Sequence, residues 1–289
     1  MRSFLIFLLL CSLFPVLTFA ENDNQLEIKK INLQKEELLH YQLSFIDSAL
    51  IDKKKLEKLM HSLESEIAVT PINASYDENQ RIIEGKQGKT LDRYTFKVRF
   101  IEAFYKEEDV QLEIPVKFVE PRIDAALLQE ISQKKLGSYS TYFNSSNKER
   151  TNNIMLSADA INGAVIFPGE IFSFNKTVGE RTKERGYQRA PVIVRGEFSE
   201  DIGGGICQVS STLFNAADQN GIQMVERFTH SRRVPYVPPG RDATVSWWGP
   251  DFSFKNLYNE PIVIRSKATK GYLNIEIYTS ETAENFSAD

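Results

Sequence analysis

Three consecutive glycines at positions 203–205 constrain the fold of this chain more than any other feature of its sequence. Glycine has no Cβ atom, so such a run lets the backbone turn sharply or approach a ligand closely. Residues 197–202 before the run have the pattern of a strand, and apolar residues within 206–217 recur at helical spacing. Gly221 then supplies a stop signal. The sequence therefore predicts a strand, a tight turn and a helix that starts at the Gly-Gly-Gly-Ile-Cys-Gln segment.

Cys207 falls at or near the first turn of this predicted helix. The unpaired N–H groups and the helix dipole favour an anion there, which lowers the pKa of a thiol. The neighbouring side chain of Gln208 could donate a hydrogen bond to a developing oxyanion. This position is common for cysteine nucleophiles. A buried Cys207 that packs as a small apolar residue is the alternative interpretation.

His230 is the only histidine after residue 136, and it follows a predicted strand at 223–229. A cysteine at a helix start facing a histidine on a following strand is the layout of papain-like and transglutaminase-like enzymes. Asp242 or Asp251 could orient that histidine as a third member. The candidate catalytic residues are Cys207, His230, Gln208 and Asp242. One cysteine and one histidine fall short of the ligands that zinc takes, so we predict no metal and no cofactor.

Arginine and aromatic residues are concentrated in the second half of the chain. Arginine forks suit carboxylates and phosphates, and aromatic rings stack on the apolar faces of sugars. Ordinary solvated arginines and core aromatics would explain the same pattern. The candidate ligand-binding residues are Gly203, Gly204, Gly205, Arg189, Arg232, Arg241 and Trp247.

The use of lysine, arginine and glycine changes near residue 136. Residues 21–135 contain 14 Lys, 4 Arg and 2 Gly, whereas residues 136–289 contain 6 Lys, 10 Arg and 13 Gly. Such a difference predicts two domains within one chain. The predicted parts are a first domain at 21–122, a connecting helix at 123–136, a second domain at 137–279 and a disordered tail at 280–289.

Helical and strand patterns occur in both halves, so the predicted fold class is α+β, with two small α+β domains. In the first, residues 53–67 place their apolar side chains on one helix face. Residues 110–118 alternate like a half-buried strand, and Pro115 favours an edge position for it. In the second, a hairpin over 261–267 and 272–279 and several short strands predict a mixed or antiparallel sheet.

Residues 1–20 have the pattern of a secretory signal peptide, with a positive start, an apolar run and small residues before a cleavage point after Ala20. The run is shorter than the roughly 20 residues of a membrane span, although an uncleaved N-terminal anchor is the alternative. Cleavage would remove Cys11 and leave Cys207 alone, so no intrachain disulfide is predicted. We therefore expect a secreted protein with no membrane span after cleavage. The sequence does not indicate its oligomeric state.

Three stretches carry a resemblance to a known family: FPGEIFSFN at 167–175, GGGICQVSSTLFNAA at 203–217 and the pair His230-Ser231. They make residues 137–277 similar to a VanW domain, named for an accessory protein of vancomycin-resistance clusters. The LEIPVKFVEP segment resembles part of the peptidoglycan-binding domain found upstream of VanW domains. The resemblance implies an exported or membrane-anchored bacterial protein that acts at the cell wall, without implying a particular biochemical activity.

Two functional hypotheses follow. The first is an exported cell-wall factor that binds peptidoglycan or its precursors and supports wall maintenance or glycopeptide tolerance. The second is a cysteine-dependent acyltransferase or peptidase that acts on peptidoglycan stem peptides, with Cys207 as nucleophile and His230 as base. The formal net charge of −4, the pI near 5.6 and the export signal disfavour nucleic acid as a partner.

Overall fold

The computed structural model describes residues 29–43, 50–106, 108–194 and 197–285. The chain divides into two compact units, Met1–Ile67 with Leu91–Lys117 and Ala68–Thr90 with Phe118–Asp289. The composition predicts a contiguous division instead, because it cannot show that residues 68–90 pack with the second unit. Each unit contains helices together with antiparallel strands, which confirms the predicted α+β class.

The first unit packs its helices around a small core of aliphatic and aromatic side chains. The apolar face of α2 (Lys53–Ile67), which the sequence predicts, meets the phenylalanines of α3 (Arg93–Lys106). The remaining elements are α1 (Lys35–Leu39) and the antiparallel pair β1 (Lys30–Leu33) and β5 (Val110–Glu113). The core includes Leu56, Met60, Leu63, Phe96, Phe100 and Phe104.

The predicted strand at 110–118 is two strands in the structure. Strand β5 ends at Glu113, and β6 (Val116–Val119) begins after Pro115. Strand β5 pairs with β1, whereas β6 pairs with β4 (Gly88–Leu91). Proline has no N–H to donate to a ladder, so the strand changes its partner at this residue.

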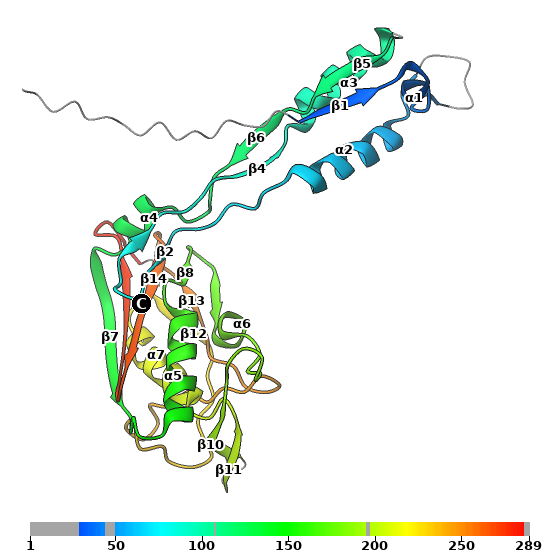
Figure 1. Cartoon of the computed structure of the whole chain (residues 1–289). Coiled ribbons are helices and arrows are strands. Elements are labelled where there is room, and N and C mark those ends of the chain that lie inside the picture. Colours follow the sequence, from blue (N-terminus) through cyan, green and yellow to red (C-terminus); the bar gives the residue numbers. More distant parts are fainter. Residues whose placement is uncertain (1–28, 44–49, 107, 195–196, 286–289) are drawn as a thin grey trace, which may run out of the picture. The chain divides into compact units, whose positions relative to one another are not determined.

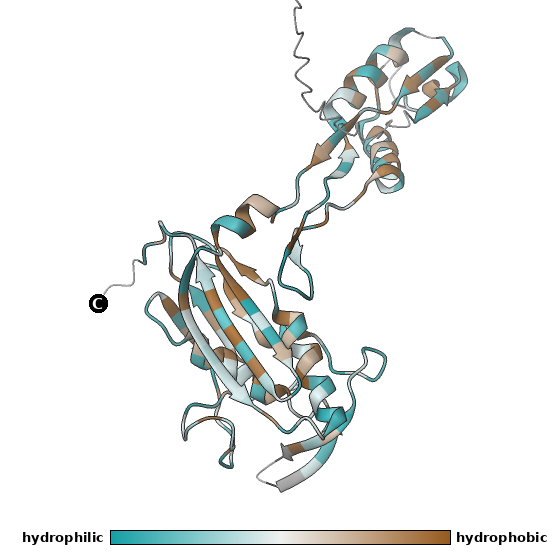
Figure 2. Ribbon diagram, turned by 60° about the vertical axis from the view of Figure 1, so that its left-hand side comes forward, coloured by the Kyte–Doolittle hydropathy of each residue, from teal (hydrophilic) through white to brown (hydrophobic). Residues whose placement is uncertain are grey.

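A four-stranded antiparallel sheet forms the centre of the second unit. Its order is β7 (Lys134–Tyr142), β15 (Tyr272–Thr279), β14 (Ile262–Thr269) and β8 (Val165–Ile166). Helices α5 (Lys148–Ile161) and α7 (Ile206–Ala217) pack against this sheet and against each other (Figure 1). Apolar and polar residues alternate along the strands, as Figure 2 shows, and the apolar ones face the core. The predicted C-terminal hairpin is β14 with β15.

Smaller elements complete the second unit beside this sheet. A three-stranded antiparallel sheet and a two-stranded hairpin carry the loops that matter for the site described below. These elements are β9 (Ile171–Ser173), α6 (Phe174–Val178), β10 (Arg189–Val194), β11 (Glu197–Ile202), β12 (Ile222–Glu226) and β13 (Ser253–Asn256).

Residues 68–90 contribute to a separate apolar cluster of the second unit. They form the short pair β2 (Ser75–Tyr76) and β3 (Ile82–Ile83), which lies against α4 (Ala125–Glu130). The buried members of the cluster are Ala74, Leu128, Ile131 and Val263. This packing is the physical reason why the segment belongs with the second unit.

Two predicted boundaries differ in the structure. The connecting helix expected at 123–136 is α4, capped by Asp124, and it ends at Glu130 because β7 begins at Lys134. Part of the predicted tail is ordered, since Ala283 is buried and its carbonyl accepts a hydrogen bond from Lys134 Nζ. The predicted signal peptide and residues 286–289 lie outside the described residues. In the part that is described, no helix is long and apolar enough to cross a membrane.

Candidate active site

The glycine run places Cys207 in the first turn of α7. Strand β11 ends at Ile202, and α7 begins at Ile206 with Gly205 at its N-cap. Gly203 and Gly205 have φ angles of +90° and +107°, a region in which a side chain would be strained. The run therefore turns the chain sharply from hairpin to helix and leaves Cys207 at the positive end of the helix.

Gly204 is required for a different reason, a close approach of two backbones. A Cβ atom here would lie 2.4 Å from the carbonyl O of Ala190 in β10. We expect Gly204→Ala to lower the free energy of unfolding by about 1–3 kcal/mol, because the hairpin or the helix must shift. Urea unfolding followed by circular dichroism measures this loss. Gly249→Ala is the control, since its backbone, like that of Gly204, lies outside the positive-φ region and a Cβ there would meet only the flexible side chain of Ser246; an equal loss there would contradict the steric explanation.

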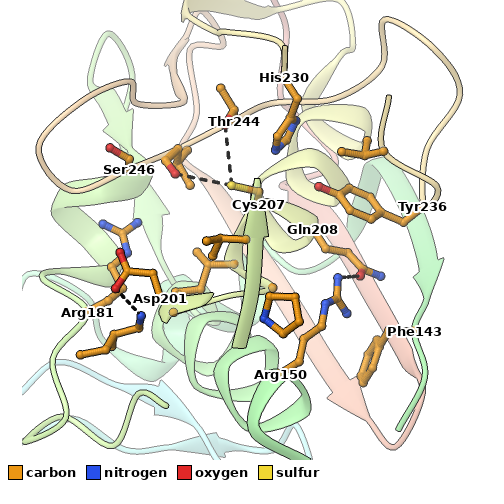
Figure 3. Close-up of a pocket in the computed structure, with 18 of the residues that line it drawn as sticks. Phe143, Arg150, Arg181, Asp201, Cys207, Gln208, His230, Tyr236, Thr244 and Ser246 are labelled. Carbon is orange, nitrogen blue, oxygen red and sulfur yellow. Dashed lines mark hydrogen bonds between the residues drawn. The ribbon is translucent and has the colours of Figure 1, made fainter. Parts of the chain in front are cut away.

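His230 and Asp242 complete a constellation around Cys207. Asp242 Oδ2 accepts a hydrogen bond from the backbone N–H of His230 and lies 2.6 Å from Nδ1 of the His230 ring. The side chains of His230 and Asp242 are only 6% and 10% exposed. The carboxylate thereby fixes the ring beside Cys207, whose thiol the His230 side chain faces (Figure 3).

The pKa values of this pair shift in opposite directions. Burial opposes ionisation of the thiol, but the hydrogen bond and the charge of His230 outweigh it, so the pKa of Cys207 lies below its ordinary 9.0. Burial likewise opposes protonation of His230, yet Cys207 and Asp242 raise its pKa above the ordinary 6.5. Both shifts favour a thiolate–imidazolium pair, the form in which a cysteine is a nucleophile.

Cys207 and His230 line a cavity of about 830 Å³ (Figure 3). Its walls come from α5, the β10–β11 hairpin, the first turn of α7 and the loop 234–248. The thiol sulfur lies 3.4 Å from the carbonyl O of Val245 and 3.8 Å from Thr244 Oγ1, so it is held at the wall. A cavity of this size accommodates a small ligand or a short piece of peptide.

Gln208, which the sequence suggests as an oxyanion donor, has its side-chain amide bonded within the protein. Its side chain is 1% exposed, and its Nε2 donates to Thr141 Oγ1 and to the carbonyl O of Tyr142, both at 3.0 Å. Its Oε1 accepts a hydrogen bond from Arg150 Nη2 at 2.7 Å. Both ends of the amide are therefore in use, and neither is directed at an oxyanion beside Cys207.

The structure also decides between the two aspartates considered for His230. Asp251 accepts hydrogen bonds from Ser173 Oγ and from the backbone N–H of Asn175, at the start of α6. It is therefore committed to that helix, and Asp242 is the partner of His230.

The other predicted ligand-binding residues have mixed positions. Gly203, Gly205 and Trp247 line the cavity, whereas Gly204, Arg189, Arg232 and Arg241 are not among its lining residues. Arg241 instead bonds to Asn215 and Asp218. Arg150, Arg181 and Tyr236 also line the cavity, although the sequence did not identify them as candidate ligand-binding residues. Burial raises the pKa of Tyr236, and the nearby Cys207 thiolate raises it further, so the phenol stays protonated.

No group of three or more His, Cys, Asp or Glu side chains that could hold a metal occurs among the described residues.

Comparison with known proteins concerns the same region. The family model described as VanW like protein matches residues 149–278, which include all three members of the constellation. The uncharacterized protein YoaR of Bacillus subtilis is 50% identical over 232 residues, which cover 80% of this chain and 77% of the relative. The chain belongs to the VanW family. The VanW resemblance predicted from the sequence motifs is thus confirmed, whereas the peptidoglycan-binding domain upstream of it stays a prediction.

A second VanW-family relative is the vancomycin B-type resistance protein VanW of Enterococcus faecalis. It is 31% identical over 109 residues, which cover 36% of this chain and 40% of that protein. The chain is therefore related to a vancomycin-resistance protein over part of its length. No solved structure matches the chain.

Proposed function

We propose that this VanW-family chain is a cysteine-dependent acyl-transfer enzyme that acts on peptides of the bacterial cell wall. The observation that carries the proposal is the constellation of Cys207, His230 and Asp242 at one cavity, with the thiol at a helix start and the imidazole held by a carboxylate. Binding without catalysis, which the sequence favours, would need the cavity but not this arrangement.

In the first step, the Cys207 thiolate attacks an amide carbonyl carbon, and the carbonyl π electrons move to oxygen. Within the described residues, the backbone N–H of Cys207 has no acceptor, whereas the amides on either side of it, those of Ile206 and Gln208, donate to the carbonyls of Gly203 and Gly205. This N–H, at the positive end of α7, is the donor we assign to the oxyanion.

In the second step, the tetrahedral intermediate collapses and the C–N bond breaks. The His230 imidazolium protonates the leaving amine, which leaves an acyl thioester on Cys207 and a neutral ring. An incoming amine or water then attacks the thioester while His230 takes its proton. The thiolate and the imidazolium are thereby restored, and Asp242 stabilises the charged ring throughout.

The relationship to a vancomycin-resistance protein supports a cell-wall substrate. In this proposal the apolar N-terminal segment exports the chain, and the first unit contacts peptidoglycan near the site of reaction. These parts of the proposal rest on the sequence patterns, whereas the chemistry rests on the geometry at Cys207.

Trapping of the acyl-enzyme tests the chemistry. The chain without residues 1–20 is incubated with synthetic stem peptides, quenched in acid and weighed by intact-mass spectrometry. We expect a mass increase equal to the acyl fragment, and no increase in Cys207→Ala. Equal adduct in Cys207→Ala would refute the thioester. Retention of Cys207→Ala on purified sacculi, with neither adduct nor product from the unsubstituted chain, would instead favour the binding function.

A further inference from the structure

Two arginines line the cavity on either side of Cys207 without a carboxylate partner. Arg150 comes from the first turn of α5, and Arg181 follows α6; Figure 3 shows the thiol between them. Neither forms an ion pair with any carboxylate in the described part of the chain. Arg93, by contrast, forms ion pairs with Glu57 and Glu64.

Arg150 is held in place by Gln208. The Gln208 amide is anchored on β7 through Thr141 Oγ1 and the carbonyl O of Tyr142, and its Oε1 accepts one guanidinium N–H of Arg150. This is the only side-chain hydrogen bond of Arg150 among the described residues. The rest of its donor fork is available at the cavity wall.

Arg181 is held in a similar way on the opposite wall. Its Nη2 donates to Asn175 Oδ1 at 2.7 Å, and Asn175 is fixed by the carbonyls of Ser246 and Pro250. Its Nη1 and the Nε1 of Trp247 are buried and have no hydrogen-bond partner in the described structure. Its guanidinium lies 6.0 Å from the Trp247 ring centre, so two unmet donors come from neighbouring residues.

Burying a cation without a partner is unfavourable. Burial lowers the pKa of both arginines, which reflects this cost. An anionic ligand would offset it. Glu180 and Asp201 also line the cavity, but neither forms an ion pair with Arg150 or Arg181 in the described structure, so each guanidinium can still bind one carboxylate of a ligand. The cavity also has apolar lining, which suits an amino-acid or peptide ligand better than a bare inorganic anion.

We propose that the acyl substrate carries a free carboxylate, that Arg150 and Arg181 bind carboxylate groups beside Cys207, and that Gln208 is the positioning residue for Arg150. The inference rests on the proposed function, because it places the carboxylate relative to the reacting thiol. In this proposal Gln208 of the Gly-Ile-Cys-Gln segment positions Arg150 and does not bind the oxyanion.

The test compares two alkylating reagents of nearly equal size, iodoacetate and iodoacetamide. Both react with the same thiolate and release iodide, but only iodoacetate carries a carboxylate. Dividing the rate constant for iodoacetate by that for iodoacetamide therefore cancels any change in the pKa of Cys207. We expect Arg150→Gln and Arg181→Gln each to lower this ratio by roughly tenfold, the effect of losing one charge-assisted hydrogen bond.

Matched variants separate the explanations. Arg189→Gln removes a positive charge away from the cavity and should leave the ratio unchanged. Gln208→Met should lower the ratio while the iodoacetamide rate persists, whereas a purely structural role would slow both reagents equally. Glutarate should protect Cys207 from iodoacetamide, and its neutral diamide should not.

The outcomes keep this inference apart from the proposed function. If Cys207 reacts rapidly with both reagents and the ratio is the same in all variants, the carboxylate site is refuted while the nucleophile stands. If Cys207 reacts with neither reagent until the chain unfolds, the proposed function fails as well. Protection by inorganic phosphate but not by glutarate would overturn the ligand class.

Discussion

Replacing His230 with glutamine is expected to slow alkylation of Cys207 by iodoacetamide at pH 7 by about 10- to 100-fold. Burial raises the pKa of this thiol, and the hydrogen bond and charge of His230 are the largest of the interactions that bring it below 9.0, ahead of Val245 and Thr244. Without the imidazolium, the thiolate at neutral pH becomes a small fraction. Stopped-flow alkylation from pH 5 to 10 measures the change, and the midpoint should move to a higher pH in the variant.

The same pair has a defined effect on stability. The folded pKa of Cys207 is lowered, so its contribution is fully present above the ordinary 9.0 and is lost as the pH falls through the folded value. The folded pKa of His230 is raised, so its contribution is fully present below the ordinary 6.5 and is lost as the pH rises through the folded value.

A reactivity midpoint unchanged in His230→Gln would show that the imidazole does not activate the thiol.

Asp242→Asn is expected to reduce the rate of acyl-enzyme formation by about 10²- to 10⁴-fold. The carboxylate accepts from both the backbone N–H and the ring Nδ1 of His230. An amide can present its NH₂ group to Nδ1, which selects the tautomer that cannot accept a proton at the nitrogen facing Cys207. Single-turnover acylation, followed by quenched-flow mass spectrometry, measures this loss.

Asp251→Asn is the matched control for that variant. Asp251 accepts hydrogen bonds from the backbone N–H groups of Asn175 and Phe252, but it does not contact His230 in the structure. We expect this substitution to lower stability and to leave the acylation rate within a fewfold of the unsubstituted chain. An equal loss of acylation in the two variants would contradict a specific role for Asp242.

The local part of this structure could be predicted from the sequence. The glycine run, the helix after it and the position of Cys207 depend on neighbouring residues, and so does the C-terminal hairpin. His230 could be proposed as a partner because no other histidine follows residue 136. The choice between Asp242 and Asp251 could not be made, because both lie in loops whose course depends on the sheets that hold them.

The long-range part could not be predicted. Arg150 reaches Gln208 across 58 residues of sequence, so no local pattern marks it as part of the site. A glutamine beside a cysteine suggests an oxyanion donor, but burial and three polar neighbours commit its side chain elsewhere. Strand 110–118 has one alternating pattern, yet Pro115 separates two segments with different partners, and periodicity within a single strand carries no information about pairing.

Residues 68–90 pack with the second unit, although residues 91–117 after them belong to the first. The coding sequence therefore cannot be cut at one point to give the two units separately. A gene fragment that begins after residue 122 would encode Leu128, Ile131 and Val263 but not Ala74, which packs with them. The shortened product would present that apolar surface to water and would be prone to aggregate. Recombination at the apparent compositional boundary would cause the same damage, so the two units are expected to be inherited together.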